Sequence, residues 1–224
     1  MLKAINAVIF DMDGVIFDSE KVYYQAFFMA ADKHEVEATN DFVHRFAGKT
    51  AEDCQHILYN YFNRDFEKTR LFFRDWAESR LDILSERGLE FKEGFLNLFD
   101  NIRQSGRPVG LVTSAHRADM EENFSRNNSR LLSEFEHIIT IEDVKKPKPH
   151  PQPYQRMMDR LEQKPEHCIV IEDSISGVRA GVQSGAKTIM INENILPPEE
   201  IGEKLLLHTD HHDNILMFLK ENGL

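Results

Sequence analysis

The sequence predicts an α/β fold, a doubly wound parallel sheet with an all-helical domain inserted after its first strand. Short runs rich in valine and isoleucine alternate with segments of helical periodicity. This is the pattern of a parallel sheet that is covered by helices on both faces. Between residues 19 and 88, by contrast, no segment has the composition of a strand. An interval of roughly 70 residues is too long for a loop, so a second domain is expected there.

The expected strands are short and buried, and they cover residues 4–10, 108–113, 168–172 and 187–192, with 137–143 as a weaker candidate. Helical patterns fill the intervals at 94–105, 115–126, 152–163 and 177–184. Glycines at 106 and 185 are typical stops for the first and last of these helices. Residues 1–18 and 89–224 are therefore expected to form one α/β domain with right-handed crossovers.

The inserted segment, 19–88, is expected to be a small helical domain. Apolar residues recur at helical spacing from residue 22 to 31, and a long helical pattern that begins near residue 65 ends at Gly88. Thr50 is the expected N-cap of another helix, with Asp53 at the capping-box position. The aromatic residues at helical spacing are expected in the core of this domain: Tyr23, Tyr24, Phe27, Phe28, Phe72, Phe73 and Trp76.

The net charge, the length of the apolar runs and the cysteine content restrict the kinds of partner that the protein can bind. The formal net charge of −11 argues against nucleic acid and anionic membranes, because the long-range field is repulsive. No apolar run reaches the length of about 18 residues that a membrane-spanning helix needs. The two cysteines, Cys54 and Cys168, provide no disulfide framework. We therefore expect a cytoplasmic protein, a monomer or weak homodimer, that acts on a small molecule.

Polar groups follow the expected strands, at the edge where open α/β sheets bind ligands. They are Asp11 and Asp13 after the first strand, Thr113 and Ser114 after the second, Lys145, Lys146 and Lys148 after the weaker candidate, and Glu172 and Asp173 at 168–172. Several carboxylates at one edge cannot all stay ionised without compensation. A hard cation such as Mg²⁺, together with a lysine, would supply it. The pattern therefore predicts a magnesium site that holds a phosphoryl group.

Four motifs make the chain resemble the haloacid-dehalogenase-like superfamily of phosphotransferases. They are "DMDGV" at 11–15, "LVTSA" at 111–115, "KPHPQPY" at 148–154 and "IEDSISGVRAGVQSGAKTIMI" at 171–191. The helical segment lies where this family carries a cap, in the subgroup of β-phosphoglucomutase and many sugar-phosphate phosphatases. The resemblance implies a Rossmann-like core. It also implies a Mg²⁺-dependent phosphatase that hydrolyses a small phosphorylated metabolite, a sugar phosphate in particular, through an aspartyl-phosphate.

The resemblance also implies roles for individual residues. Asp11 would be the nucleophile, and Asp13 the general acid and base. The metal would be held by Asp11, the backbone carbonyl of Asp13 and Asp173, with Glu172 either a direct ligand or just behind the ligands. Thr113 would hydrogen-bond the phosphoryl group.

The lysine of the third motif has two candidate positions. Lys148 would pair with Asp11 and with the phosphoryl oxygen. Lys146 also precedes a Pro-x-Pro, and Lys148 is preferred because it places Tyr154 at the family's aromatic position.

A sugar phosphomutase is the alternative reaction. Such enzymes carry a histidine early in the cap and an arginine in a cap loop, and Tyr23 and Ala51 occupy these positions here. Lys49 is the only cation close to the second position, in a segment that could equally be a plain turn. The expected substrate-binding residues are Ser114, Lys49, His116 and Arg117. A phosphatase is therefore favoured over a mutase.

Overall fold

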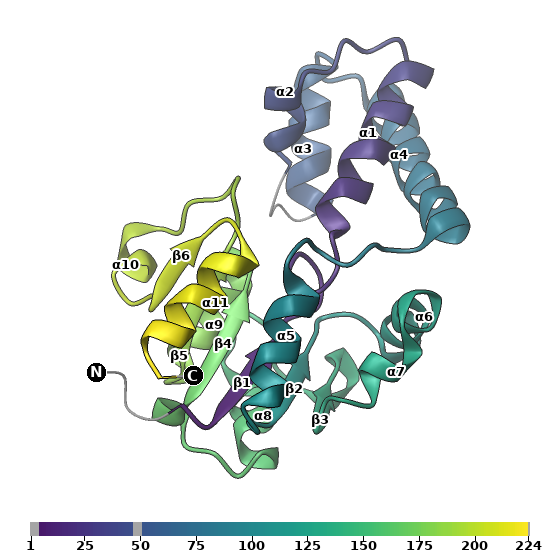
Figure 1. Cartoon of the computed structure of the whole chain (residues 1–224). Coiled ribbons are helices and arrows are strands. Elements are labelled where there is room, and N and C mark those ends of the chain that lie inside the picture. The colour runs from purple at the N-terminus through teal and green to yellow at the C-terminus, as the bar shows by residue number, and fades with distance from the viewer. Residues whose placement is uncertain (1–4, 47–50, 224) are drawn as a thin grey trace. The chain divides into compact units, whose positions relative to one another are not determined.

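The computed structural model describes residues 5–46 and 51–223 (Figure 1). The chain divides into two compact units, one formed by Met1–Asp18 with Glu90–Leu224 and the other by Ser19–Leu89. The second boundary lies one residue later than the expected one, because the buried Leu89 belongs with the helical unit. Among the helices of the described residues, none combines the length and the apolar character needed to cross a membrane.

The α/β unit is built on a six-stranded parallel sheet in the order β3-β2-β1-β4-β5-β6. The strands are β1 (Ala7–Phe10), β2 (Val109–Val112), β3 (His137–Ile139), β4 (Cys168–Glu172), β5 (Lys187–Ile191) and β6 (Leu207–Thr209). In β1, Val8 pairs with Val109 of β2 on one side and with Ile169 of β4 on the other. The first strand of the chain thus lies at the centre of the sheet, and its carboxyl end lies between the ends of β2 and β4.

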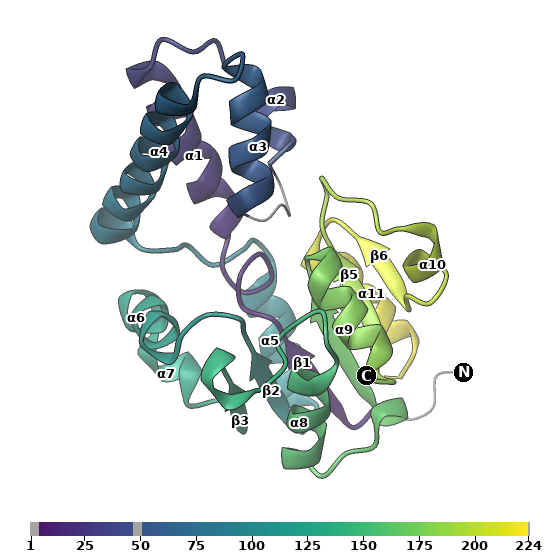
Figure 2. The same cartoon turned by 180° about the vertical axis from the view of Figure 1, so that it is seen from behind.

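Helices cover both faces of the sheet (Figures 1 and 2). In this unit they are α5 (Phe95–Gln104), α6 (Arg117–Asn127), α7 (Ser129–Leu132), α8 (Gln152–Arg160), α9 (Ile175–Gln183), α10 (Glu199–Gly202) and α11 (His212–Glu221), with short 3₁₀ turns at Ile141–Asp143 and Pro165–His167. Ile9 of β1 belongs to a buried cluster with Met157 of α8 and Ala180 of α9. The ring of Phe10 faces the other way and contacts Phe95 and Phe99 of α5. Alternate residues of one strand therefore fill two separate cores.

The inserted unit is entirely helical in its described residues. Its helices are α1 (Ser19–Lys33), α2 (Asn40–His44), α3 (Ala51–Tyr61) and α4 (Phe66–Arg87). Asp65 caps the start of α4, where its side chain accepts a hydrogen bond from the backbone N–H of Lys68. Gly88 ends α4 with a φ of +70°, a conformation that suits glycine. Thr50, the expected cap of α3, lies outside the described residues.

Aromatic rings form the core of the inserted unit, although fewer of them are buried than the sequence predicts. The Phe27 ring lies 5.1 Å from that of Phe72 and 5.0 Å from that of Trp76, and all three side chains are buried. Tyr23 and Phe28 are exposed instead, so that part of the prediction was wrong. Tyr23 and Phe28 belong to α1, but they do not lie on its buried face, which contains Val22, Ala26, Phe27, Ala30 and Ala31.

Candidate active site

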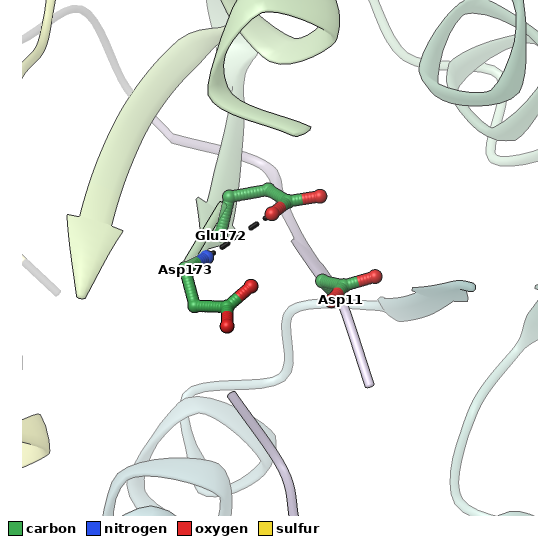
Figure 3. Close-up of side chains that lie close together, drawn as sticks. All are labelled: Asp11, Glu172 and Asp173. Carbon is green, nitrogen blue, oxygen red and sulfur yellow. Dashed lines mark hydrogen bonds between the residues drawn. The ribbon is translucent and has the colours of Figure 1, made fainter. Parts of the chain in front are cut away.

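Asp11 lies at the carboxyl end of the central strand, where the structure brings several predicted residues together. Its backbone N–H donates to the carbonyl of Ile171 in β4, which ties the ends of the two strands. One carboxylate oxygen from each of Asp11, Glu172 and Asp173 lies within 4.8 Å of the others. Figure 3 shows the three side chains converging on a common space. Residues that are far apart in the sequence therefore form one compact acidic cluster, because β1 and β4 are neighbours in the sheet.

A glycine allows the turn after Asp11 to pass close to this cluster. Gly14 has a φ of +73°, and a Cβ atom at this position would lie 1.9 Å from a carboxylate oxygen of Asp173. Any side chain at residue 14 would therefore displace Asp173. The glycine of the first motif follows from its positive φ and from this close approach between the turn and the end of β4.

Lys148 is the cation of the cluster. Its Nζ lies 2.5 Å from Oδ1 of Asp11, 2.6 Å from Oε1 of Glu172 and 3.2 Å from the carbonyl oxygen of Val112. An ammonium group has three N–H donors, so these acceptors use all of them. Lys146 lies exposed in the same loop, where its backbone N–H donates to Gln152. The structure therefore brings the preferred lysine, Lys148, to Asp11.

Glu172 is completely buried and accepts five hydrogen bonds. Lys148 and the hydroxyl of Tyr154 donate to Oε1, each at 2.6 Å. The backbone N–H groups of Asp173 and Ser174 and the Ser174 hydroxyl donate to Oε2. A carboxylate offers about four lone-pair positions, so this one is saturated. Of the two roles expected for Glu172, the arrangement favours the one behind the metal ligands.

Burial and charge shift the pKa values of this cluster. Burial, followed by the negative charge of Glu172, raises the pKa of Asp11 from 3.8 to about 8, although Lys148 opposes this shift. Burial lowers the pKa of Lys148, but the charges of Asp11 and Glu172 outweigh it and raise that pKa overall. Burial and the charge of Glu172 also raise the pKa of Tyr154. Lys148 and Tyr154 therefore remain donors, whereas burial and the charge of Glu172 disfavour the ionised form of Asp11.

The donor set fits a divalent metal ion. Asp11 and Asp173 offer hard carboxylate oxygens, which are the ligands that Mg²⁺ prefers. Asp11, Glu172 and Asp173 bring three carboxyl groups together at a single lysine, Lys148, so acidic groups outnumber the basic one in this cluster. A cation between Asp11 and Asp173 would supply the missing charge and return Asp11 to its ionised form.

The predicted hydroxyl groups differ in exposure. Thr113 is buried at the end of β2, and its Oγ1 accepts a hydrogen bond from the backbone N–H of Ala115, which leaves the hydroxyl proton to donate elsewhere. Ser114 is exposed beside it. Asp13 is half-buried in the turn that contains Gly14, and its carboxylate is not part of the three-residue cluster.

The predicted substrate-binding cations are engaged by acidic residues or lie outside the described residues. His116 Nδ1 lies 2.8 Å from Oε1 of Glu142, and the guanidinium group of Arg117 donates to Asp143 at 3.1 Å. A side-chain hydrogen bond with Thr140, together with weaker contributions that include His116, lowers the pKa of Glu142 to about 2, so the acid remains ionised at neutral pH. Lys49 lies outside the described residues. The structure therefore shows both side chains at the start of α6 engaged by acidic residues, Arg117 in an ion pair with Asp143 and His116 in a hydrogen bond with Glu142.

Two residues that the motif analysis did not select support the acidic cluster. Lys92 donates from Nζ to the carbonyl of Gly14 at 2.8 Å, and the side chain of Asn192 donates to the carbonyl of Asp173 at 3.1 Å. Asn192 directly follows β5, so the rule that selected the other strand-end residues would have found it. Nothing in the local sequence marks Lys92.

The comparisons with known proteins identify the family. The model of the haloacid dehalogenase-like hydrolases matches residues 8–191. The chain belongs to this family. A relative from Thermotoga maritima, named a phosphorylated carbohydrates phosphatase, is 29% identical over 185 residues, which are 83% of this chain and 84% of the relative. These findings confirm the predicted family and the prediction of an enzyme of the phosphatase type.

Solved structures show the same fold. A haloacid dehalogenase family hydrolase from Deinococcus radiodurans, crystallised with phosphate and sodium, has a TM-score of 0.79 and 21% identity, with 98% of this chain and 96% of that one covered. A β-phosphoglucomutase from Clostridium difficile has a TM-score of 0.64 and 20% identity, with coverages of 97% and 96%. The predicted α/β fold of the family is therefore confirmed.

Proposed function

We propose that the protein is a Mg²⁺-dependent phosphatase that hydrolyses a small phosphorylated metabolite, a sugar phosphate in particular, through an aspartyl-phosphate on Asp11. The observation that carries this proposal is the convergence of Asp11, Asp173 and Lys148 at the end of the central strand. Family membership and the named T. maritima phosphatase support the same reaction.

The arrangement supports a distinct role for each residue. Asp11 attacks the phosphorus atom, and Lys148 fixes its Oδ1 so that the other oxygen is aimed at the substrate. Asp13 protonates the leaving oxygen and then accepts a proton from the attacking water. The Thr113 hydroxyl donates to a phosphoryl oxygen. Bound Mg²⁺, held by Asp11, Asp173 and the carbonyl of Asp13, would neutralise charge on the phosphoryl group.

A phosphomutase is the second candidate, because a β-phosphoglucomutase is among the structural neighbours. A mutase must bind a second phosphate group, which requires additional cations. In the α/β unit the predicted candidates, His116 and Arg117, are paired with Glu142 and Asp143. A second phosphate would have to compete with these carboxylates, and this favours the phosphatase.

The net charge and the cysteines bear on where the protein acts and on the partners that it can bind. We propose a cytoplasmic enzyme, a monomer or weak homodimer, with no nucleic-acid or membrane partner. The support is the net charge of −11 and the burial of Cys54 and Cys168 without a disulfide between them, which suits a reducing compartment.

The test is phosphate release from a panel of sugar phosphates, other phosphomonoesters and pyrophosphate, with Mg²⁺ and with a chelator. We expect turnover that requires the metal. Asp11→Asn should reduce kcat by at least about a thousandfold because the amide is a poor nucleophile. Asp159→Asn, at an exposed position of α8, is the matched control and should behave as the wild type.

Two outcomes would contradict the proposal. Turnover that persists in the chelator would rule out the metal site, and wild-type turnover by Asp11→Asn would rule out the nucleophile. A separate assay uses β-glucose 1-phosphate with a bisphosphate activator. Isomerisation faster than phosphate release would identify the mutase instead.

A further inference from the structure

Lys92 lies outside the four motifs, yet it makes two hydrogen bonds to the turn that carries Asp13. Its backbone N–H donates to the carbonyl of Ile16, and its Nζ donates to the carbonyl of Gly14, both at 2.8 Å. Within the turn, Gly14 N–H donates to Phe17 and Ile16 N–H donates to Met12. One residue that is distant in sequence thus closes the turn both through its backbone and through a charge-assisted hydrogen bond.

Asp173 also lies close to Gly14. A Cβ atom on Gly14 would lie 1.9 Å from the Asp173 carboxylate, so little space is left between the turn and the cluster. The Gly14 carbonyl is held by the ammonium group of Lys92. The position of this residue therefore depends both on the close approach of Asp173 and on the hydrogen bond from Lys92. Asp13 is joined to it directly by a peptide bond.

We propose that Lys92 is a positioning residue that fixes the Gly14 turn and, through it, the placement of Asp13 against the substrate. Without the ammonium group, the Gly14 carbonyl is free to rotate and the turn can relax away from its position. A proton-transfer group that is displaced by about 1 Å loses much of its effect, even when substrate binding is intact. This inference rests on the proposed function, because it needs Asp13 to act in the reaction.

The test compares Lys92→Met, Lys92→Arg and Lys187→Met. Lys187 is the matched control, because its Nζ also donates to a backbone carbonyl, that of Glu166, at 2.8 Å. This residue lies at the amino-terminal end of β5, away from the acidic cluster. We expect Lys92→Met to lower kcat about tenfold or more while KM changes less than about twofold. Lys92→Arg should recover most of kcat because it restores a charged donor. Lys187→Met should match the wild type.

A second measurement reports on the turn directly and does not depend on catalytic activity. Hydrogen exchange measured by mass spectrometry should show faster exchange of residues 11–18 in Lys92→Met, and no change there in Lys92→Arg or Lys187→Met. If Lys92→Met fails to fold, Lys92→Gln replaces it, since its shorter, neutral side chain should give a kcat below that of Lys92→Arg. Wild-type kcat with unchanged exchange, or a raised KM with unchanged kcat, would overturn the inference. A wild-type protein that is inactive on every substrate would overturn the proposed function alone, and exchange would still decide the role of Lys92 in the turn.

Discussion

At the scale of single residues, the site is a network in which buried charges are satisfied by partners from distant parts of the chain. Glu172 is fully buried, and it is stabilised by five donors that include Lys148 and the Tyr154 hydroxyl. A buried carboxylate with saturated oxygens is held in one orientation, since any rotation breaks several hydrogen bonds. Glu172 therefore fixes the position of the Lys148 ammonium group, and Lys148 in turn fixes Oδ1 of Asp11.

Removing the hydroxyl of Tyr154 tests whether its hydrogen bond to Glu172 stabilises the folded protein. In Tyr154→Phe the ring keeps its packing, and Glu172 Oε1 retains only Lys148 as a donor. The loss of one hydrogen bond to a buried charge should lower the free energy of unfolding by about 1–3 kcal/mol. Chemical denaturation measures this change, with Tyr61→Phe at an exposed position as the control. Equal stability of Tyr154→Phe and the wild type would show that the hydroxyl contributes nothing to holding Glu172.

The sequence predicted the parts of this network that directly follow a strand. Asp11 and Asp173 could be placed together because the carboxyl ends of parallel strands meet at one side of the sheet. Lys92 and the Tyr154 hydroxyl could not be assigned, because their partners lie 78 and 18 residues away and no local pattern records the pairing. The five donors to Glu172 are also a property of packing, which is why the sequence left two roles open for this residue.

At the scale of elements, the start of α11 contains a buried histidine that ties this helix to the segment before α5. His212 is the first residue of α11 and is completely buried, and its Nδ1 lies 2.9 Å from the carbonyl of Glu93. Burial lowers the pKa of His212 from 6.5 to about 4, although the hydrogen bond with Glu93 opposes this shift. The imidazole is therefore neutral in the folded protein at neutral pH.

This pKa shift predicts a pH-dependent stability. The folded state binds the His212 proton less readily than the unfolded state, so acid favours unfolding. The contribution of His212 is fully present above pH 6.5 and should decline as the pH falls from 6.5 to about 4. Denaturation curves of the wild type and of His212→Asn, whose amide can donate to Glu93, should converge over this range. A constant difference between the two proteins at every pH would contradict the assigned shift.

The sequence predicted the long elements of the fold better than the short ones. The four Val- and Ile-rich runs correspond to β1, β2, β4 and β5, because buried parallel strands have a continuous apolar pattern. β6, by contrast, has three residues, of which only Leu207 is apolar, and an exposed His208 at its centre, so the strand itself has no apolar run. The four-residue helices α7 and α10 are too short to show a helical repeat.

At the scale of the whole molecule, the acidic cluster should couple metal binding to stability. Asp11, Glu172 and Asp173 come from β1 and the end of β4, so a bound cation would join segments that separate on unfolding. A ligand that binds only the folded state stabilises it by about 2.7 kcal/mol at a concentration of 100 times its Kd. The folded state should therefore gain stability when Mg²⁺ is added.

Thermal unfolding measures this gain. Saturating Mg²⁺ should raise the Tm by roughly 5 °C relative to chelator at matched ionic strength, because the cation relieves the repulsion around Asp11. Asp173→Asn should remove most of the shift, whereas Asp159→Asn should keep it. An equal shift in Asp173→Asn and the wild type would show that Mg²⁺ acts elsewhere on the protein.

The central position of β1 has a consequence for the synthesis of the chain. Ala7–Phe10 leaves the ribosome before both of its partners, since β2 follows about 100 residues later and β4 about 160 residues later. Until β2 emerges, neither side of this apolar strand has its partner, and until β4 emerges one side still lacks it. Assembly of the sheet is therefore a late event that depends on contacts between distant parts of the chain, and partly made chains expose the segment most prone to aggregate.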